Sequence, residues 1–137
     1  IDFKNPDKLL FQVPHGDTPD AIRNHPLLKG LNIGKTGQGG SVGVLITKTL
    51  VVVGDPQFTA PPGRARGAML RAYDKQTGAQ LGEVLLPAPV VGMPMTYSVG
   101  GRQYVVVGVS GGNYTGEYIS LALPQSEIRS TTTAGQQ

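Results

Sequence analysis

The fold is decided by the stretch Met69-Leu70-Arg71-Ala72-Tyr73, followed by Asp74-Lys75-Gln76-Thr77-Gly78 and then by residues 81–86. The two outer segments have the length and the apolar content of β-strands. Between them, an aspartate can hydrogen-bond the backbone of a tight turn, and Gly78 can take the left-handed conformation that closes it. The stretch therefore predicts two antiparallel strands joined by a turn.

A second strand pair precedes this one. Residues 42–47 and 50–54 are runs rich in β-branched side chains, and only Lys48-Thr49 separates them. Such runs with a short link favour a hairpin. We therefore expect residues 41–87 to form one complete four-stranded antiparallel sheet.

The same pattern recurs further along the chain. Val51-Val52-Val53-Gly54 matches Val105-Val106-Val107-Gly108, and each unit ends on Leu-Pro, at 86–87 and at 123–124. This indicates a repeat of about 50 residues, close to the period of propeller blades. Strands are expected at 95–99, 103–108 and 118–123, with the first two joined by Gly100-Gly101. The second unit, residues 88–124, thus lacks a fourth strand and is an incomplete blade.

The rest of the chain is assigned from its turn-forming residues and its polarity. Residues 1–14 are expected to end a preceding blade, with a strand at 9–13. Residues 15–40 are expected to form a long inter-blade loop with one or two helical turns within 20–29. The Ser/Thr-rich tail, 125–137, is expected to be disordered. Because the chain begins at Ile1 inside this pattern, we expect it to be a processed product or a piece of a longer protein.

Composition supports a β-rich domain and narrows the function. Hydrophobic residues make up 39% of the chain and charged residues 15%, with Gly 20 and Pro 11. No apolar run approaches the roughly 18 residues of a membrane span. The net charge is +3, but the basic residues are spread thinly, with Arg64, Arg66 and Arg71 the one local concentration, which disfavours nucleic-acid binding. The absence of cysteine excludes disulfides and thiolate metal sites.

Three short motifs are weighed and set aside. Gly34-Lys35-Thr36 lacks the glycine at position 29 that a phosphate-binding loop requires. Two Gly-x-Ser-x-Gly matches, at 39–43 and 108–112, are not followed by a helix, and both histidines precede them, contrary to the order of an α/β-hydrolase. His15, Asp17 and His25 do not have the spacing of a metal site, so both histidines are interpreted as satisfied or solvent-facing loop residues.

The repeat carries a family resemblance. Residues 70–78, Pro94-Met95-Thr96-Tyr97, residues 101–107 and Ser110-Gly111-Gly112 resemble the closing blades of pyrroloquinoline-quinone (PQQ)-dependent dehydrogenases. Residues 16–19 and 24–31 resemble the inter-blade loop of the membrane glucose dehydrogenase-like branch. The resemblance implies an all-β fold in which this chain supplies the C-terminal blades of an eight-bladed propeller.

The resemblance also implies a chemistry. Such proteins hold PQQ and Ca²⁺ or Mg²⁺ at the propeller axis and oxidise an alcohol or sugar hydroxyl in the periplasm or outside the cell. Their aspartate base and most of their metal and quinone ligands lie upstream, so no catalytic or metal residue is assigned in this chain. The remaining blades, or another chain pairing the open sheet edges, are the expected partners.

This sequence departs from the family pattern at three places. It has no tryptophan, and Phe11 and Gly82 lie near the positions where relatives carry a docking tryptophan. Gly67 stands where sugar-oxidising relatives have an acidic residue, and Asn113 where they have a histidine after the Gly-Gly pair. The alternative that stays open is a non-catalytic propeller that serves as an assembly scaffold.

The candidate cofactor-binding residues are Gly111, Gly112 and Asn113, at the mouth of the quinone pocket that the resemblance implies. The Asn113 amide offers two donors and one acceptor to a substrate hydroxyl or a quinone oxygen. A second interpretation is that Asn113 merely tolerates a left-handed turn conformation.

Overall fold

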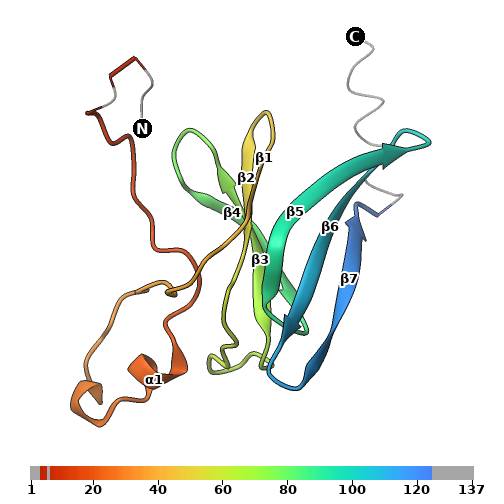
Figure 1. Ribbon diagram of the computed structural model, residues 1–137. Coiled ribbons are helices and arrows are strands. Elements are labelled where there is room, and N and C mark those ends of the chain that lie inside the picture. Colours follow the sequence, from red (N-terminus) through yellow and green to blue (C-terminus); the bar gives the residue numbers. More distant parts are fainter. Residues whose placement is uncertain (1–3, 6, 125–137) are drawn as a thin grey trace.

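Two antiparallel sheets make up most of the molecule (Figure 1). The computed structural model describes residues 4, 5 and 7–124. The first sheet has the order β1-β2-β3-β4, and the second has the order β5-β6-β7. Their bounds are β1 (Val44–Ile46), β2 (Leu50–Gly54), β3 (Ala68–Asp74), β4 (Gln80–Leu86), β5 (Val90–Val99), β6 (Arg102–Gly111) and β7 (Tyr114–Ala122). The predicted four-stranded and three-stranded sheets are thereby confirmed.

The tight turns adopt the conformations that their glycines predict. Gly78 closes the β3–β4 turn with φ of 74°. Its partner Asp74 accepts hydrogen bonds from the backbone N–H groups of Gln76 and Thr77, at 2.9 and 2.8 Å. Gly100 and Gly101, with φ of 57° and 76°, form the β5–β6 turn, and two successive positive φ angles are typical of a type I′ hairpin.

The segment before the first sheet differs in part from expectation. Two short helical turns, α1 (Asp20–Arg23) and the 3₁₀ turn η1 (Pro26–Leu28), confirm the helical character predicted within the loop. Residues 9–13, however, form no strand, so that prediction was wrong. A strand requires a hydrogen-bonded neighbour, and the described residues offer this segment none. The predicted tail, 125–137, lies outside the described residues.

The second sheet begins earlier than its sequence suggests. Strand β5 starts at Val90, whereas the sequence predicted a start near Met95, and its pairing with β6 shifts register between Val91 and Met95. Gly92, with φ of 78°, lies within this irregularity. Such a bulge accommodates Pro94 because a shifted strand does not need every backbone N–H for its ladder.

The hydrophobic core lies between the two sheets. Its buried members include Val52, Leu70 and Leu86 from the first sheet and Val107 and Val109 from the second. Gly54 lies against the Val90 side chain so closely that no Cβ would fit there. Gly43 approaches the Gly92 backbone in the same way. These contacts set the two sheets face to face, as neighbouring blades are set in a propeller.

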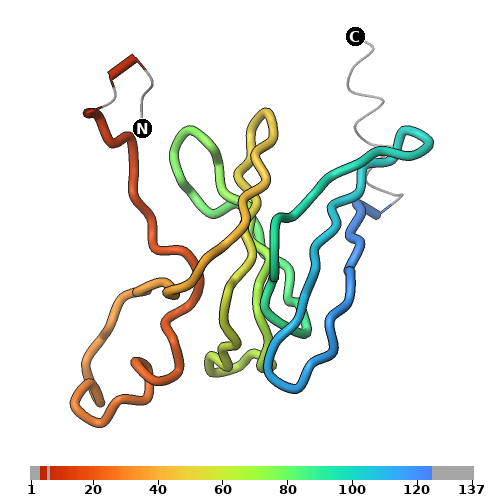
Figure 2. The backbone as a smooth tube through the Cα atoms, viewed as in Figure 1, coloured from red at the N-terminus to blue at the C-terminus, as the bar shows by residue number. Residues whose placement is uncertain are grey.

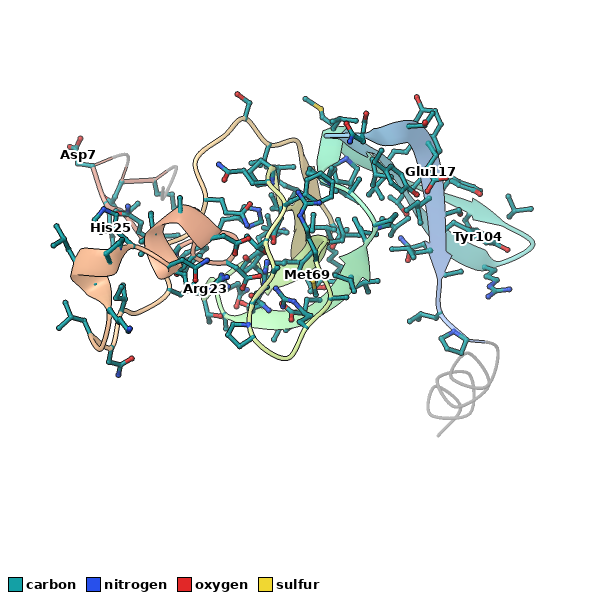
Figure 3. The ribbon with its side chains drawn as sticks, turned by 90° about the horizontal axis from the view of Figure 1, so that it is seen from below. Asp7, Arg23, His25, Met69, Tyr104 and Glu117 are labelled. Carbon is teal, nitrogen blue, oxygen red and sulfur yellow. The ribbon has the colours of Figure 1, made fainter. Side chains whose placement is uncertain are left out.

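The other face of the first sheet is covered by the N-terminal segment. Figure 3 shows Arg23 and His25 of the connecting loop on the opposite side of Met69 from Tyr104 and Glu117 of the second sheet. A small cavity of about 220 Å³ lies between residues of this segment, including Phe11 and His15, and the β2–β3 face around Tyr73. The first sheet is thus sandwiched between a loop and a sheet.

Connections gather at two ends of the molecule. Figure 2 shows that the connections at 55–67, 87–89 and 112–113 lie at one end of the two sheets. The turns at 47–49, 75–79 and 100–101 lie at the opposite end. We call the first of these the long-loop end. It carries the residues that the sequence singles out for binding.

Candidate functional site

The Gly111–Asn113 turn joins β6 to β7 at the long-loop end. Gly111 and Gly112 have φ of 139° and 58°, and no non-glycine residue among those described has a positive φ. The interpretation of Asn113 as a residue that tolerates a left-handed conformation was therefore wrong, because Gly112 takes that conformation. The Asn113 side chain is exposed, so its amide is available to a ligand.

Phe58 packs beside this turn and links it to the first sheet. The Phe58 ring lies 3.6 Å from the position that a Cβ would occupy at Gly111, and 3.4 Å from that position at Gly112. The next residue, Thr59, pairs with Gly67 through two backbone hydrogen bonds of 2.9 and 3.0 Å. Arg66 lies over the Phe58 ring, with its Cζ atom 3.9 Å from the ring centroid.

Gly67 and Asn113 both adjoin the Phe58–Thr59 segment: Gly67 pairs with Thr59, and Asn113 follows the Gly112 that the Phe58 ring approaches. These are the two places where this sequence departs from the sugar-oxidising pattern. Phe58 and its neighbour Thr59 join them, and no feature of the sequence singled Phe58 out beforehand. Its role depends on a contact between two sheets, which strand periodicity does not encode.

A buried ion-pair cluster lies on the loop-covered face of the first sheet. Arg71 is 2% exposed, and its guanidinium contacts Asp55, which is fully buried, through two hydrogen bonds of 2.8 and 2.9 Å. It also reaches Asp17 at 2.9 Å and pairs with Glu83. Arg64 pairs with Asp17 and, at 3.3 Å, with Glu83.

The cluster favours the charged forms of Arg71 and Asp17. Burial by itself disfavours the Arg71 cation, but its hydrogen bonds and ion pairs with Asp55, Asp17 and Glu83 outweigh this and raise its pKa. Burial also disfavours the Asp17 carboxylate, which raises the pKa of Asp17, but Arg64 and Arg71 lower this pKa by more. Asp17 lies in the 15–40 loop, Asp55 directly after β2, Arg71 in β3 and Glu83 in β4. Their ion pairs therefore join the loop to the first sheet.

Sequence reasoning missed this cluster, although one signal for it was present. Arg71 is a charged residue in the middle of an apolar strand, and a buried charge requires a partner of opposite sign. Its partners at 17, 55 and 83 come from three separate segments, so their identity depended on the tertiary structure.

Both loop histidines hydrogen-bond protein groups, His15 through both ring nitrogens and His25 through one. His15 lies with Nδ1 3.0 Å from the Tyr73 hydroxyl and Nε2 3.0 Å from the Gly54 carbonyl oxygen. Because a carbonyl only accepts, Nε2 donates to the Gly54 carbonyl oxygen, and Nδ1 shares the second hydrogen bond with the Tyr73 hydroxyl. His25 accepts a hydrogen bond from the Leu27 backbone N–H. Asp17 pairs with arginines. The interpretation of His15 as a satisfied residue is confirmed.

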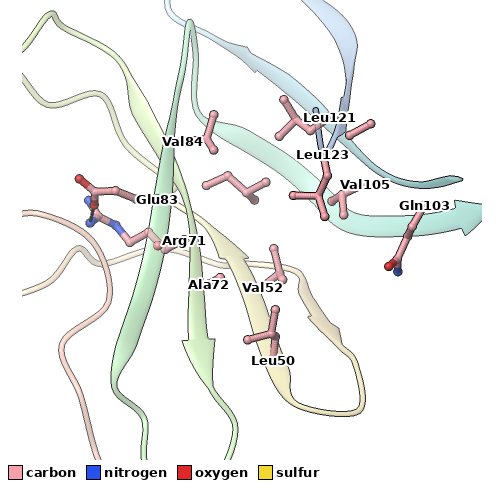
Figure 4. Close-up of a pocket in the computed structure, with 13 residues that line it drawn as sticks. Leu50, Val52, Arg71, Ala72, Glu83, Val84, Gln103, Val105, Leu121 and Leu123 are labelled. Carbon is pink, nitrogen blue, oxygen red and sulfur yellow. Dashed lines mark hydrogen bonds and ion pairs between the residues drawn. The ribbon is translucent and has the colours of Figure 1, made fainter. Parts of the chain in front are cut away.

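The larger cavity lies between the sheets and is apolar. It has a volume of about 440 Å³ and is lined by side chains such as Leu50, Val52, Val84, Val105 and Leu121 (Figure 4). Gly82 also lines it, with no atom within 4 Å of the place a Cβ would occupy. Residues 111–113 do not border this cavity, so it is an incompletely filled core rather than part of the candidate site.

The two cavities lie away from the Gly111–Asn113 turn. No three His, Cys, Asp or Glu side chains among residues 4, 5 and 7–124 are grouped to hold a metal ion. The turn and the Phe58–Arg66 pair offer a rim of exposed hydrogen-bond donors.

Comparison with known proteins identifies relatives of this chain. Residues 1–105 match the family model of the β-propeller domain of PQQ-containing glucose, ethanol and alcohol dehydrogenases. The chain is 32% identical over 132 residues, 93% of its length, to the quinoprotein glucose dehydrogenase A of Acinetobacter calcoaceticus. It is 36% identical over 118 residues, 83% of its length, to the glycerol dehydrogenase large subunit of Gluconobacter oxydans.

A further relative is the cytochrome c methanol dehydrogenase subunit 1 of Paracoccus denitrificans, 41% identical over 63 residues, which is 44% of this chain and 10% of that protein. The chain spans only 15% and 14% of the lengths of the glucose and glycerol dehydrogenases. No solved structure gives a significant match. Within the described residues, no helix is long and apolar enough to cross a membrane.

Proposed function

Because this chain belongs to the β-propeller family of PQQ-dependent glucose, ethanol and alcohol dehydrogenases, we propose that it supplies the C-terminal blades of a quinoprotein dehydrogenase. The full-length protein oxidises a hydroxyl group of an alcohol or a sugar. The observation that carries the proposal is the 93% coverage of this chain by a quinoprotein glucose dehydrogenase. Two sheets packed face to face with an exposed apolar outer side support it as well.

The substrate class follows from the relatives as a group. Their names specify glucose, glycerol and methanol, which share a primary or secondary hydroxyl group. When bound, PQQ supplies a two-electron acceptor for the oxidation of such a group, and Ca²⁺ or Mg²⁺ is the metal that the family implies. Among residues 4, 5 and 7–124 no three His, Cys, Asp or Glu side chains are grouped to hold a metal ion, so we assign this chain only a part of the pocket rim.

The rim role falls to Gly111, Gly112 and Asn113. The two glycines let the backbone turn without a side chain, which leaves the Asn113 amide free at the long-loop end. An amide binds a hydroxyl or a carbonyl oxygen without the charge that a histidine acquires on protonation. Asn113 thus orients a neutral polar group and does not move a proton.

The partners and the location follow from the same proposal. Strand β7 is the last strand of its sheet among the described residues. The N–H and C=O groups on its outer edge can therefore pair with a fourth strand from the full-length protein or from another chain. The protein is periplasmic or secreted, as the family resemblance implies. Cell fractionation that placed it in the cytoplasm would contradict this.

The test is an assay of the full-length protein. We expect it to bind PQQ in the presence of Ca²⁺ and to reduce an electron-accepting dye when given an alcohol or a sugar. We also expect the isolated 137-residue chain to show no such activity, because the family resemblance implies that the catalytic base and most ligands lie upstream of it. A full-length protein that neither binds PQQ nor reduces the dye would overturn the proposal and leave the assembly scaffold in its place.

A further inference from the structure

The larger cavity, between the two sheets, is separate from the rim at the long-loop end. Its lining comes from β2, β3 and β4 of the first sheet and from β6 and β7 of the second. Leu50 at the start of β2 and Gln103 near the start of β6 both border it. The cavity therefore lies toward the turns at 47–49 and 100–101, opposite to the Gly111–Asn113 turn.

The two walls of this cavity have different shapes. On the first sheet, Ala72 of β3 is paired with Gly82 of β4, and no atom lies within 4 Å of the place a Cβ would occupy at Gly82. Two small residues side by side leave the backbone of that sheet as a flat floor. On the second sheet, Val105 of β6 is paired with Leu121 of β7, and Figure 4 shows both side chains across the space from Ala72.

The size and form of the space suit a small molecule. Its volume of about 440 Å³ lies within the range of small-molecule binding sites. Because the walls are the faces of two packed sheets, the space extends along the sheets and is narrow across them. A planar ring fills such a space better than a puckered one of the same composition.

The cavity is lined by apolar groups. Arg71 and Glu83 border it, but Figure 4 shows their side chains extending away from it, where their charged ends pair with each other. The Gln103 amide donates a hydrogen bond to the Thr96 hydroxyl at 2.9 Å. Among the described residues, no lining side chain has a buried polar atom without a partner. Such a space offers water few hydrogen bonds and favours an apolar ligand.

We propose that this cavity is a binding site for a flat, neutral aromatic molecule of one or two fused rings. One face of the ring lies on the floor at Ala72 and Gly82, and the other packs against Val105 and Leu121. The ligand enters beside Leu123, which borders the cavity and is 62% exposed. This site goes beyond the proposed function and does not depend on it.

The test is isothermal titration calorimetry of the full-length protein with 2-naphthol and decahydro-2-naphthol. Both are neutral alcohols with the same two-ring carbon skeleton, and only 2-naphthol is flat. We expect 2-naphthol to bind with a Kd on the order of 0.1–1 mM, as ligands of this size do. Decahydro-2-naphthol should bind about tenfold more weakly or worse, because a puckered ring overfills the narrow space.

Three variants locate the site. Gly82→Leu fills the cavity from the first sheet and Val105→Phe fills it from the second, so each should weaken 2-naphthol binding about tenfold or more. Gly34→Leu is the matched control, because Gly34 also has no atom within 4 Å of a Cβ position but lies in the connecting loop. It should leave 2-naphthol binding unchanged. Circular dichroism checks folding, and if Gly82→Leu does not fold, Val105→Phe decides.

Three outcomes would overturn the proposal. The first is no binding of 2-naphthol to the wild type at millimolar concentration. The second is wild-type affinity for 2-naphthol in folded Gly82→Leu and Val105→Phe, which would place the ligand elsewhere. The third is equal affinity for the two alcohols, which would reject a site for planar rings. Since the titration requires neither PQQ nor turnover, its result is independent of the proposed dehydrogenase activity.

Discussion

At the scale of single residues, Asn113 is the candidate contact that a substitution isolates most cleanly. Its backbone does not have a positive φ, so Asn113→Ala fits the turn and removes the amide without the added backbone freedom of glycine. In the full-length enzyme we expect kcat/KM to fall tenfold or more, about 1.4 kcal/mol of transition-state stabilisation. The measurement is steady-state dye reduction with circular dichroism as the check of folding. An unchanged kcat/KM in a folded variant would reject the contact.

Asp17 provides a prediction on pH. Its carboxyl is desolvated, which raises the pKa, but Arg64 and Arg71 lower it to below the ordinary value. A carboxyl with a depressed folded-state pKa contributes stability above its unfolded pKa of about 3.9, and this contribution is lost as pH falls through the folded pKa. We therefore expect the free energy of unfolding to drop in acid below about pH 4.

The comparison is with Asp17→Asn, which cannot titrate. Its free energy of unfolding should be lower than that of the wild type at neutral pH, and its further decrease in acid should be smaller. Urea unfolding of both proteins at neutral and acidic pH measures the two slopes. Parallel curves for the two proteins would show that the Asp17 ion pairs contribute nothing to the acid response.

At the scale of elements, Gly82 and Gly54 predict opposite effects of added side-chain volume. Gly82 in β4 faces the apolar cavity of about 440 Å³, whereas Gly54 in β2 is pressed against Val90. Gly82→Leu should stabilise the protein by roughly 1–2 kcal/mol, because it buries new apolar surface and removes a flexible glycine from a strand. Gly54→Ala should destabilise it by about 1–3 kcal/mol through overpacking.

Chemical denaturation of the two variants beside the wild type decides this prediction. The resemblance predicts the same stabilising effect of added volume at Gly82. Related blades carry a docking tryptophan near this position, and its absence would leave such a cavity. A destabilised Gly82→Leu would mean that the sheets do not tolerate a side chain between them.

Local patterns predicted most of the strands, because alternation and turn glycines act within a few residues. The 70–86 hairpin and the Gly100-Gly101 turn are of this kind. Features that depend on distant partners were predicted less well. The strand expected at 9–13 has no pairing neighbour within the part of the chain that the structure describes, and the early start of β5 depends on a bulge opposite β6. The Arg71 cluster and the Phe58 contact with Gly112 both join segments far apart in the sequence.

At the scale of the whole molecule, the outer face of the second sheet remains uncovered among the described residues. Met93 is 78% exposed, Met95 53%, Val99 62% and Tyr118 85%. The strand register pairs Met95 of β5 with Val106 of β6, and Gly108 of β6 with Tyr118 of β7. The exposed side chains therefore lie on one face that extends across the three strands. An exposed apolar face beside an unpaired strand edge favours association.

We therefore expect the isolated chain to self-associate in solution. The double variant Met95→Lys with Tyr118→Lys should shift it toward the monomer, because charges oppose burial of that face. Leu27→Lys is the matched control, since Leu27 is 83% exposed but lies in the connecting loop. Light scattering measures the three masses. A monodisperse, stable wild-type monomer would contradict the expectation.

The two faces of the first sheet also have a consequence for how repeats find their correct neighbours. One face presents an arginine surrounded by carboxylates, and the other presents only aliphatic side chains. Similar units in one chain risk joining in the wrong order or the wrong way round. Here a reversed unit would set a desolvated cation against leucine and valine, which is strongly unfavourable. The first sheet thus has a chemical polarity that favours one direction of assembly.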